Sequence, residues 1–375
     1  MKLKRIIKGT IKWTIRVVLV LLLLVSAWLF IAYWRSTNDC ESLLAAPGAR
    51  MKAVIYCDYG EADVLHLAEI AKPVPNDNQL LVRVRAASVN PYDWHFIRGT
   101  PYLMRLGVGL RKPKNSRLGV DFAGTVEAVG KNVTEFKPGD EVYGGKTGAF
   151  AQYICVSEKG VVRKPENLTF EQAGSVQIAG MTALQALRKF AHVQPGQRVL
   201  INGASGGVGT FAVQIGKALG AHVTGVCSGR NADMVRSLGA DEVIDYTKQD
   251  FAQSGKQWDV ILDNVPNHSL SDCRHSLTAK GKYIMIGGGG PEDGRWIGPF
   301  ARVIKLMLLE PFVNQEMRMM MSDPTKDDMT YLRDLMQSGK VTPVIDRRFS
   351  LGQVPEAIWY LEKGHARGKV VITVD

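Results

Sequence analysis

The sequence predicts an α/β protein built from a β-rich domain and a doubly wound parallel-sheet domain, preceded by one transmembrane helix. Three observations support this fold class. Val17–Trp34 is an uncharged apolar run that follows a basic N-terminus. Residues 51–176 hold short, often alternating apolar segments separated by Gly, Pro and Asn, which is typical of strands. From residue 198 onward strands and helices alternate, as in a parallel sheet covered by helices.

The composition fits a folded chain with sizeable cores and excludes several classes of protein. Of the 375 residues 46% are hydrophobic, and the length is enough for two domains. The net charge is +11, and the first fifty residues carry eight Lys or Arg against two acids. The sequence contains no nucleic-acid-binding motif and no repeat of solenoid length. We therefore expect no nucleic-acid partner.

The apolar run predicts a membrane anchor within residues 1–50, with its helix at about residues 17–34. Such a helix would be about 27 Å long, close to the ~30 Å of a hydrocarbon core. Its flanking aromatic residues resemble interfacial anchors: Trp13, Trp28, Tyr33 and Trp34. A cleaved signal peptide is a weaker interpretation because bulky and charged residues follow the run, and a buried core helix is a third.

The orientation of this anchor is ambiguous. The basic flank predicts a cytoplasmic N-terminus with the rest of the chain across the membrane. The remaining sequence indicates a protein that needs a cytosolic cofactor. We expect a single-pass membrane protein with its catalytic domain on the cytoplasmic side, although the basic N-terminus argues the opposite.

The five cysteines lie far apart and form no CxxC pair: Cys40, Cys57, Cys155, Cys227 and Cys273. In a chain of this length, a disulfide framework and a cysteine-built zinc site are both disfavoured. We expect isolated thiols in a reducing compartment.

The order of segments predicts a β-rich domain that is interrupted by the parallel-sheet domain. Residues 51–176 form the first part of the β-rich domain, and residues 177–313 the parallel-sheet domain. Residues 314–375 end in strand-like segments again, so we expect them to return to the first domain.

The segment VLINGASGGVGTFAVQIGKALG reads as strand, glycine turn and helix, which predicts a dinucleotide phosphate loop. Ala204, Gly206 and Gly209 occupy the G-x-G-x-x-G offsets, with Ala in place of the first glycine. The turn lets the backbone approach a pyrophosphate, and the helix N-terminus offers amide donors to it. The predicted phosphate contacts are Ala204, Ser205, Gly206, Gly207, Val208 and Gly209.

The end of the next strand predicts which dinucleotide binds. An NAD site usually has Asp or Glu about twenty residues after the loop, where it bonds the ribose hydroxyls. Here Ser228, Arg230 and Asn231 follow Cys227 instead. A guanidinium can bond a 2′-phosphate bidentately, whereas a carboxylate would repel it. We predict NADPH as cofactor; a solvated arginine at a helix start is the plainer interpretation.

Motifs along Met51–Asp375 resemble the medium-chain dehydrogenase/reductase superfamily, in its zinc-free, quinone-oxidoreductase-like branch. The motifs are ASVNPYDWHFIRG, LGVDFAGTVEAVG, KPGDEVYG, QIAGMTALQAL, NGASGGVG, SLGADEVIDY and EKGHARGKVVITVD. The resemblance implies a GroES-like catalytic domain split by a Rossmann domain, with the active site in the cleft between them. It also implies cofactor contacts at Thr182, Tyr246 and Lys369.

Positions that bind zinc in alcohol dehydrogenases of this superfamily are changed. They read Asn90, Val120–Asp121 and the cysteine-free SVQIAG, and the cysteine quartet of a structural zinc lobe is missing. We predict no zinc. His95, the one histidine near the expected cleft, is interpreted as a packing residue.

Without a Lewis acid, reduction of a conjugated acceptor is easier than reduction of a plain ketone, because the charge spreads to a distant oxygen. This agrees with what the resemblance implies, an enzyme that reduces a quinone, enone or alkenal with NADPH. Asn90 is the first catalytic candidate, and Tyr92 and Tyr102 are possible donors, with cleft packing as the alternative. Asp93 is interpreted as structural, and no general acid is assigned. The alternatives are a non-catalytic NADPH-binding scaffold or redox sensor and, less favoured, a zinc alcohol dehydrogenase.

Two segments depart from the family pattern. Pro101–Arg117 has five basic residues and no acid, which suits anionic headgroups, an acidic substrate or plain solvation. Pro299–Met321 is apolar with interspersed Arg and Lys. It is interpreted as a packed helix and strand that could form a homodimer contact, with an interfacial segment as the alternative. Together with the anchor they suggest a small, lipophilic substrate taken from the membrane.

Overall fold

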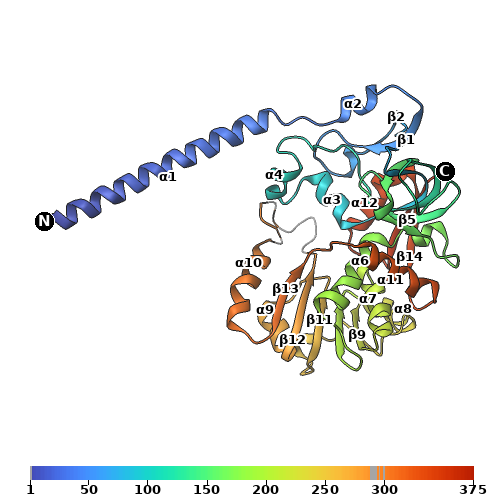
Figure 1. The fold of residues 1–375 in the computed structure, drawn as a ribbon. Helices are drawn as coiled ribbons and strands as arrows, with labels where there is room; N and C mark the ends of the chain where they lie inside the picture. The colour runs from blue at the N-terminus through green and yellow to red at the C-terminus, as the bar shows by residue number, and fades with distance from the viewer. Residues whose placement is uncertain (1, 288–293, 295, 299) are drawn as a thin grey trace.

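The computed structural model describes residues 2–287, 294, 296–298 and 300–375. Helix α1 (Lys2–Trp34) extends away from the two folded domains, and the short helix α2 (Cys40–Ala45) follows it (Figure 1). The expected anchor lies inside α1. Among the described residues, one stretch, Trp13–Trp34, is long and apolar enough to cross a membrane, and the helix alone does not distinguish an anchor from a signal sequence.

The first domain is built around a seven-stranded, mostly antiparallel sheet in the order β14-β15-β3-β4-β5-β7, with β6 paired to β3. A two-stranded sheet, β1-β2, lies beside it. Buried apolar side chains from the strands and from α12 form its core. The strands are β1 (Arg50–Ile55), β2 (His66–Ala71), β3 (Gln79–Val89), β4 (Asp121–Val129), β5 (Glu141–Gly145), β6 (Tyr153–Ser157), β7 (Val161–Arg163), β14 (Ile345–Ser350) and β15 (Lys369–Thr373). The helices are α3 (Pro91–Arg98), α4 (Arg105–Val108) and α12 (Val354–Glu362).

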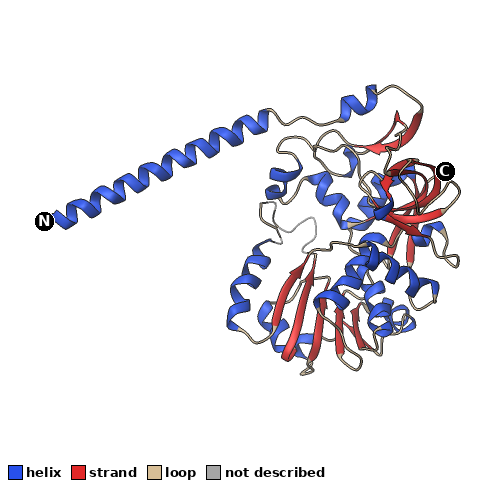
Figure 2. Ribbon diagram, in the orientation of Figure 1, coloured by secondary structure: helices blue, strands red, loops and turns tan. Residues whose placement is uncertain are grey.

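The second domain is a six-stranded parallel sheet in the order β10-β9-β8-β11-β12-β13, with helices on both faces (Figure 2). Its strands are β8 (Arg198–Asn202), β9 (His222–Cys227), β10 (Glu242–Asp245), β11 (Trp258–Asp263), β12 (Leu277–Ile286) and β13 (Glu316–Met320). Its helices are α6 (Gln177–Gln185), α7 (Gly207–Ala218), α8 (Ala232–Ser237), α9 (Leu270–His275), α10 (Phe300–Leu309) and α11 (Lys326–Gln337). Helix α5 (Phe170–Ala173), which precedes them, packs against β3 and β4 of the first domain. The predicted α/β class with GroES-like and Rossmann parts is confirmed.

The return to the first domain begins later than expected. Strand β13 pairs in parallel with β12, so it belongs to the Rossmann sheet although residues 314–375 were assigned to the other domain. Its Met317 and Met320 are buried in the cores of that sheet. Helix α11 also packs on α6, and the first returning strand is β14. An edge strand with charged residues shows only a weak alternation of apolar and polar residues, so its sheet cannot be assigned from the sequence.

The expectation of isolated thiols is wrong for two of the five cysteines. Cys40 and Cys57 form a disulfide with a Cα–Cα distance of 5.6 Å. The bond joins the first residue of α2 to a position two residues past the end of β1. Their 17-residue separation suggests isolated thiols in the sequence, but α2 packs on the β1-β2 sheet. Cys40 is buried there beside Met51 and Ile70, which brings it to Cys57. Cys155, Cys227 and Cys273 are free.

Candidate active site

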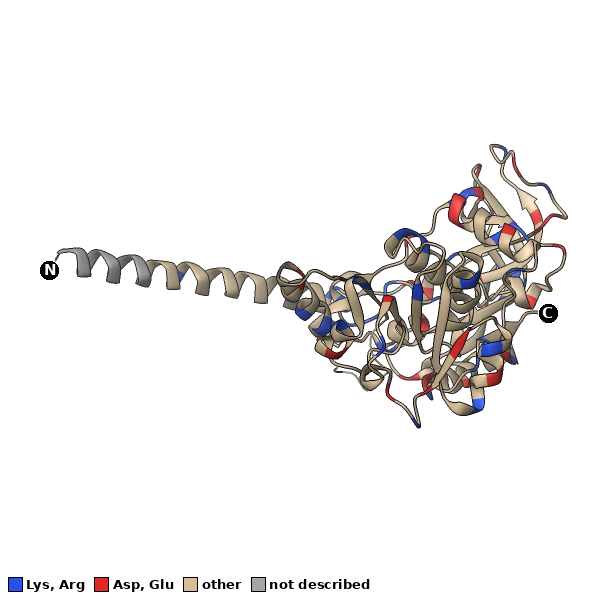
Figure 3. Ribbon diagram, turned by 90° about the horizontal axis from the view of Figure 1, so that it is seen from below, with Lys and Arg blue, Asp and Glu red and all other residues tan. Residues whose placement is uncertain are grey.

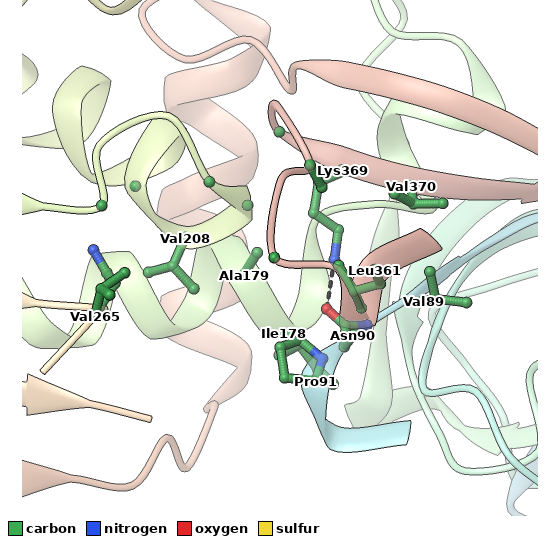
Figure 4. Close-up of a pocket in the computed structure, with 18 of the residues that line it drawn as sticks. Val89, Asn90, Pro91, Ile178, Ala179, Val208, Val265, Leu361, Lys369 and Val370 are labelled. Atoms are coloured by element: carbon green, nitrogen blue, oxygen red, sulfur yellow. Dashed lines mark hydrogen bonds between the residues drawn. The ribbon is translucent and has the colours of Figure 1, made fainter. Parts of the chain in front are cut away.

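A cavity of about 290 Å³ lies between the two domains and contains the predicted phosphate loop (Figure 4). One wall is the loop and the start of α7, and the other is formed by the end of β3 and the turn before β15. Gly206 and Gly368 form an isolated bridge across it. The lining residues that matter below are Asn90, Ile178, Ala179, Gly206, Gly207, Val208, Gly209, Val265, Leu361 and Lys369.

The loop geometry explains why this sequence can approach a pyrophosphate. Gly203 has φ +77°, which permits the tight turn after β8. The Ala204 side chain is fully buried in the domain core, and its methyl lies at 3.0 Å from a Cβ built on Gly225, so Ala replaces the first glycine without facing the ligand. The first helical bond runs from Thr210 N–H to Gly206 C=O at 2.9 Å. The amides that precede Thr210 therefore point out of the helix N-terminus.

The residues predicted to bind the far end of the cofactor gather after β9. Asn231 is buried and donates from Nδ2 to Ser205 Oγ at 3.0 Å, which ties the phosphate loop to the next turn. Its buried Oδ1 has no hydrogen-bond partner within the described chain and can accept from a ribose hydroxyl. Ser228 is half-buried, whereas Arg230 and Tyr246 are exposed beside it. This arrangement is compatible with the far end of a nicotinamide dinucleotide.

Sequence reasoning missed a carboxylate at this end of the site. Asp245 ends β10, directly beside Cys227 at the end of β9. It accepts from Thr247 N at 3.0 Å and Thr247 Oγ1 at 2.8 Å, and these bonds hold its pKa below the ordinary value. A Cβ on Gly229 would lie 2.4 Å from its Oδ2, so a larger residue there would displace the Asp245 carboxylate. The neighbouring strand could have been searched for an acid, because parallel strands end at the same edge.

A buried polar network lies at the base of the cavity. Asp121 Oδ2 accepts from Ser88 Oγ at 2.7 Å, Asn90 Nδ2 at 3.1 Å and Lys369 Nζ at 3.3 Å. Its Oδ1 accepts from the backbone of Ile178 at 2.8 Å. Lys369, only 3% exposed, also donates to Asn90 Oδ1 (Figure 4). The sequence pointed to Asn90 and Lys369 separately, and the structure joins them through Asp121.

The hydrogen bonds of Asn90 limit what it can do. Its amide group donates to Ser88 C=O at 3.2 Å and to Asp121, so both amide hydrogens are used. Lys369 carries three ammonium hydrogens, and two of them are used by Asn90 and Asp121. Among the described residues, Lys369 is therefore better placed than Asn90 to donate to a ligand in the cavity.

Asp93 supports this network from the first turn of α3. It accepts from Asn90 N at 2.8 Å and from Gly119 N at 3.1 Å, which makes it a capping residue rather than a reactant. Burial raises the pKa of its carboxyl to about 7 although both amide bonds act in the opposite direction. The structural role expected for Asp93 agrees with this geometry.

This raised pKa predicts a pH-dependent stability. An acid with a pKa of about 7 when folded and an ordinary 3.8 when unfolded binds more protons in the folded state between those values. Its contribution to stability is therefore complete at low pH and is lost as pH rises through about 7. Relative to the parent chain, Asp93→Asn should gain Tm as pH rises from about 5 to about 8. A difference in Tm that stays constant over this range would contradict the assignment.

A second cavity of about 600 Å³ shares Ile178 with the first. Tyr92, Val120, Thr182, Met321 and Met329 line its mostly apolar wall. Tyr92 is half-buried and stacks on Phe96 at 4.2 Å, and burial raises its pKa. Thr182 thus lies beside this second cavity rather than at the phosphate loop, where Ile178 and Ala179 are found instead.

Tyr102 and His95 lie apart from the lining of both cavities. The Tyr102 ring packs edge-on against Trp296 at 5.3 Å, and the Arg105 guanidinium covers it at 4.7 Å. His95 contacts Thr100 C=O through Nδ1 at 2.8 Å and packs against Trp94, and burial lowers its pKa. Its position agrees with the packing role expected for it.

The donor set at the catalytic-metal position of related enzymes does not suit zinc. Val120 presents an isopropyl group, and the carboxylate of Asp121 is already bonded to four donors, including an ammonium. Within the described residues, no group of three or more His, Cys, Asp or Glu side chains converges.

The fold and the cleft define a two-domain, NAD(P)H-dependent oxidoreductase. Two family profiles match the chain: an alcohol dehydrogenase GroES-like domain over residues 76–166 and a zinc-binding dehydrogenase domain over residues 238–372. The second profile describes zinc-binding dehydrogenases, but this chain lacks zinc-binding side chains at the positions described above.

Several known proteins are similar over nearly the whole chain. The mitochondrial NAD(P)H oxidoreductase RTN4IP1 of Mus musculus is 35% identical, over 91% of this chain and 95% of its own length. The 2-methylene-furan-3-one reductase of Solanum lycopersicum is 34% identical, over 86% and 79%. The solved quinone oxidoreductase of Coxiella burnetii is 30% identical, with a TM-score of 0.75 over 87% of this chain and 100% of its own. The chain belongs to the medium-chain dehydrogenase/reductase superfamily, in its quinone-oxidoreductase-like group.

Proposed function

We propose that this protein reduces a quinone or an α,β-unsaturated carbonyl with NADPH, without zinc, and that its substrate is a small lipophilic molecule. The observation that carries the proposal is the buried Lys369–Asp121–Asn90 network, in which Lys369 and Asn90 line the same cavity as the phosphate loop. It holds an ammonium donor, paired with the Asp121 carboxylate, near the position where a metal-dependent relative would bind its ion. The names of the mouse, tomato and Coxiella relatives support both the cofactor class and the acceptor class.

The residues of the cleft have separate roles in this proposal. When bound, NADPH would supply a hydride to the electron-poor carbon of the conjugated acceptor, and solvent water would supply the proton that completes the reduction. The amides at the start of α7 hold the pyrophosphate, and Lys369 donates a hydrogen bond to the oxygen that gains charge. Asp121 fixes the position and charge of Lys369, and Asn90 orients its ammonium group. The apolar cavity beside Tyr92 and Met329 holds the rest of the substrate and excludes water.

Arg230 is expected to select NADPH over NADH. Arg230→Ala removes charge-assisted bonds to the 2′-phosphate, each worth ~1.5–3 kcal/mol, so KM for NADPH should rise about 10- to 100-fold. KM for NADH should change by less than about twofold, because NADH has no phosphate at that position. Arg236→Ala is a matched control, since Arg236 lies on α8 and pairs with Asp233 at 3.0 Å. Equal effects on both cofactors would remove the argument for NADPH.

The activity itself is tested by following oxidation of NADPH with a panel of quinones, enones and alkenals. Turnover that is retained after exhaustive chelation supports the proposal. Cofactor binding without turnover of any acceptor would instead indicate a scaffold or redox sensor. Turnover of saturated alcohols that requires added zinc would indicate an alcohol dehydrogenase.

The membrane side of the catalytic domains is part of the same proposal. The disulfide between Cys40 and Cys57 favours an oxidising compartment for the folded domains. The basic segment before the apolar run favours a cytoplasmic N-terminus, which puts the folded domains on the other side of the membrane. We therefore place the domains on the side opposite to the cytoplasm, contrary to the expectation from cofactor supply. Protease protection of the folded domains in intact, sealed membranes tests this placement, and digestion from the cytoplasmic side would overturn it.

A further inference from the structure

An exposed apolar surface joins the two domains on the side from which α1 extends. It is formed by the 3₁₀ turn η2 (Tyr102–Met104) with α4 and by α10 with the turn η7 (Glu310–Phe312). Figure 1 shows α4 and α10 on this side of the molecule. Leu103 N–H bonds Trp296 C=O at 3.5 Å, so the two parts are continuous. We call this set the apolar face: Leu103, Leu106, Trp296, Ile297, Ile304, Met307, Leu308 and Phe312, each between 49% and 85% exposed.

Helix α10 is attached so that its apolar side chains point outward. Leu306 is its one fully buried residue, at 1% exposed. Met307 and Leu308 are both 67% exposed, and Phe312 in η7 is 85% exposed. Exposing many large apolar side chains together to water is unfavourable in free energy, so a surface of this kind marks an interaction site.

The end of α1 is fixed against the α4 side of this face. Trp28, Ala32 and Ser36 line a cavity of about 350 Å³ together with Leu106 and Lys114. Ser36 Oγ donates to Lys112 C=O at 3.4 Å, and Arg111 stacks over Trp34 at 5.4 Å. The last turns of α1 therefore lie beside α4. If Trp13–Trp34 spans a bilayer, the headgroup region lies at the level of Trp28–Trp34, and this places α4 at the membrane surface.

The charges around the apolar face match an anionic lipid surface. Residues 101–117 contain five basic side chains and no acid. Figure 3 shows Lys and Arg where the end of α1 meets the folded domains. On the α10 side Lys305 is exposed, and the nearby Glu310 is neutralised by Arg318 at 3.2 Å. Apolar side chains surrounded by basic residues bind such surfaces through buried area and electrostatic attraction together.

We propose that the apolar face rests on an anionic bilayer next to the anchor, with α10 and η7 immersed among the headgroups. The occupant is lipid rather than a second copy, because the anchor already holds the α4 end of the face at the membrane. The proposal does not depend on the substrate of the active site. It gives the protein two membrane contacts, which fix the orientation of the domains relative to the bilayer.

The test uses the full chain, one copy per lipid nanodisc, in phosphatidylcholine alone or mixed with phosphatidylglycerol. Met307→Cys and, separately, Phe312→Cys carry an environment-sensitive fluorophore, and doxyl lipids serve as quenchers. We expect blue-shifted emission and strong quenching in the anionic discs. Val74→Cys, 85% exposed in the loop between β2 and β3, is the control and should report water in both discs. The labelled parent chain gives the background from its native thiols.

Charge-reversal substitutions test the electrostatic contribution to binding of the apolar face to anionic lipid. Lys114→Glu with Lys305→Glu should reduce quenching at position 307 at least threefold in anionic discs and little in neutral ones. Turnover of a water-soluble quinone, measured in parallel, reports correct folding. Water-like emission from both labelled positions in anionic discs would overturn the proposal. Protection that requires two copies per disc would also overturn it, in favour of a contact between copies.

Discussion

Lys369→Met is expected to lower kcat/KM for a soluble quinone about 100-fold, which corresponds to ~2.7 kcal/mol. The substitution removes the buried ammonium that we place at the developing oxyanion, and charge-assisted bonds of this kind contribute ~1.5–3 kcal/mol. Asp121 keeps Ser88 Oγ, Asn90 Nδ2 and the Ile178 amide as donors, so the fold should survive. Steady-state kinetics and the Kd for NADPH are the measurements.

The distribution of this loss between kcat and binding distinguishes two roles. A donor to the oxyanion lowers kcat with little change in the Kd for NADPH, whereas a cofactor contact raises the Kd and leaves kcat at saturation intact. Lys363→Met is the matched control, because Lys363 is exposed just after α12. An unchanged kcat in Lys369→Met would contradict the role proposed for its ammonium group.

Two glycines of the phosphate loop should respond differently to the same added methyl group. A Cβ at Gly206 has Gly203 O as its nearest neighbour at 3.5 Å and projects toward the cavity, so Gly206→Ala should raise the Kd for NADPH about 100-fold or more. Its Tm without cofactor should stay within about 2 °C. A Cβ at Gly209 would lie 2.1 Å from Gly203 O, so Gly209→Ala must move backbone and should lower Tm by roughly 5 °C.

Calorimetry and NADPH titration of the two variants test this contrast. Gly107→Ala is the control for adding a methyl group, since among the described atoms nothing lies within 4 Å of a Cβ there. If Gly206→Ala bound NADPH like the parent chain, the pyrophosphate would not lie against this turn. The cofactor site proposed above would then be wrong.

The phosphate loop could be predicted because all its information is local. Strand, turn and helix follow one another within about twenty residues, and the glycines mark where the backbone must come close to another group. The same holds for the membrane-spanning length of the apolar run. The sheet to which β13 belongs could not be predicted in this way. A short edge strand is positioned by its pairing with β12 rather than by its own pattern of apolar residues.

The sequence by itself determined the family, the two-domain order, the loop that takes a dinucleotide, and the loss of zinc-binding side chains. Only the tertiary structure decided what replaces them. Lys369 lies 248 residues from Asp121 and 279 from Asn90, and sheet pairing brings them together as it brings Asp245 beside Cys227. The disulfide partners meet because α2 packs on the β1-β2 sheet. The hydrogen-bonding groups of a side chain are known from its type. Which of its donors remain free to bond a ligand depends on the neighbours that the fold brings within bonding distance.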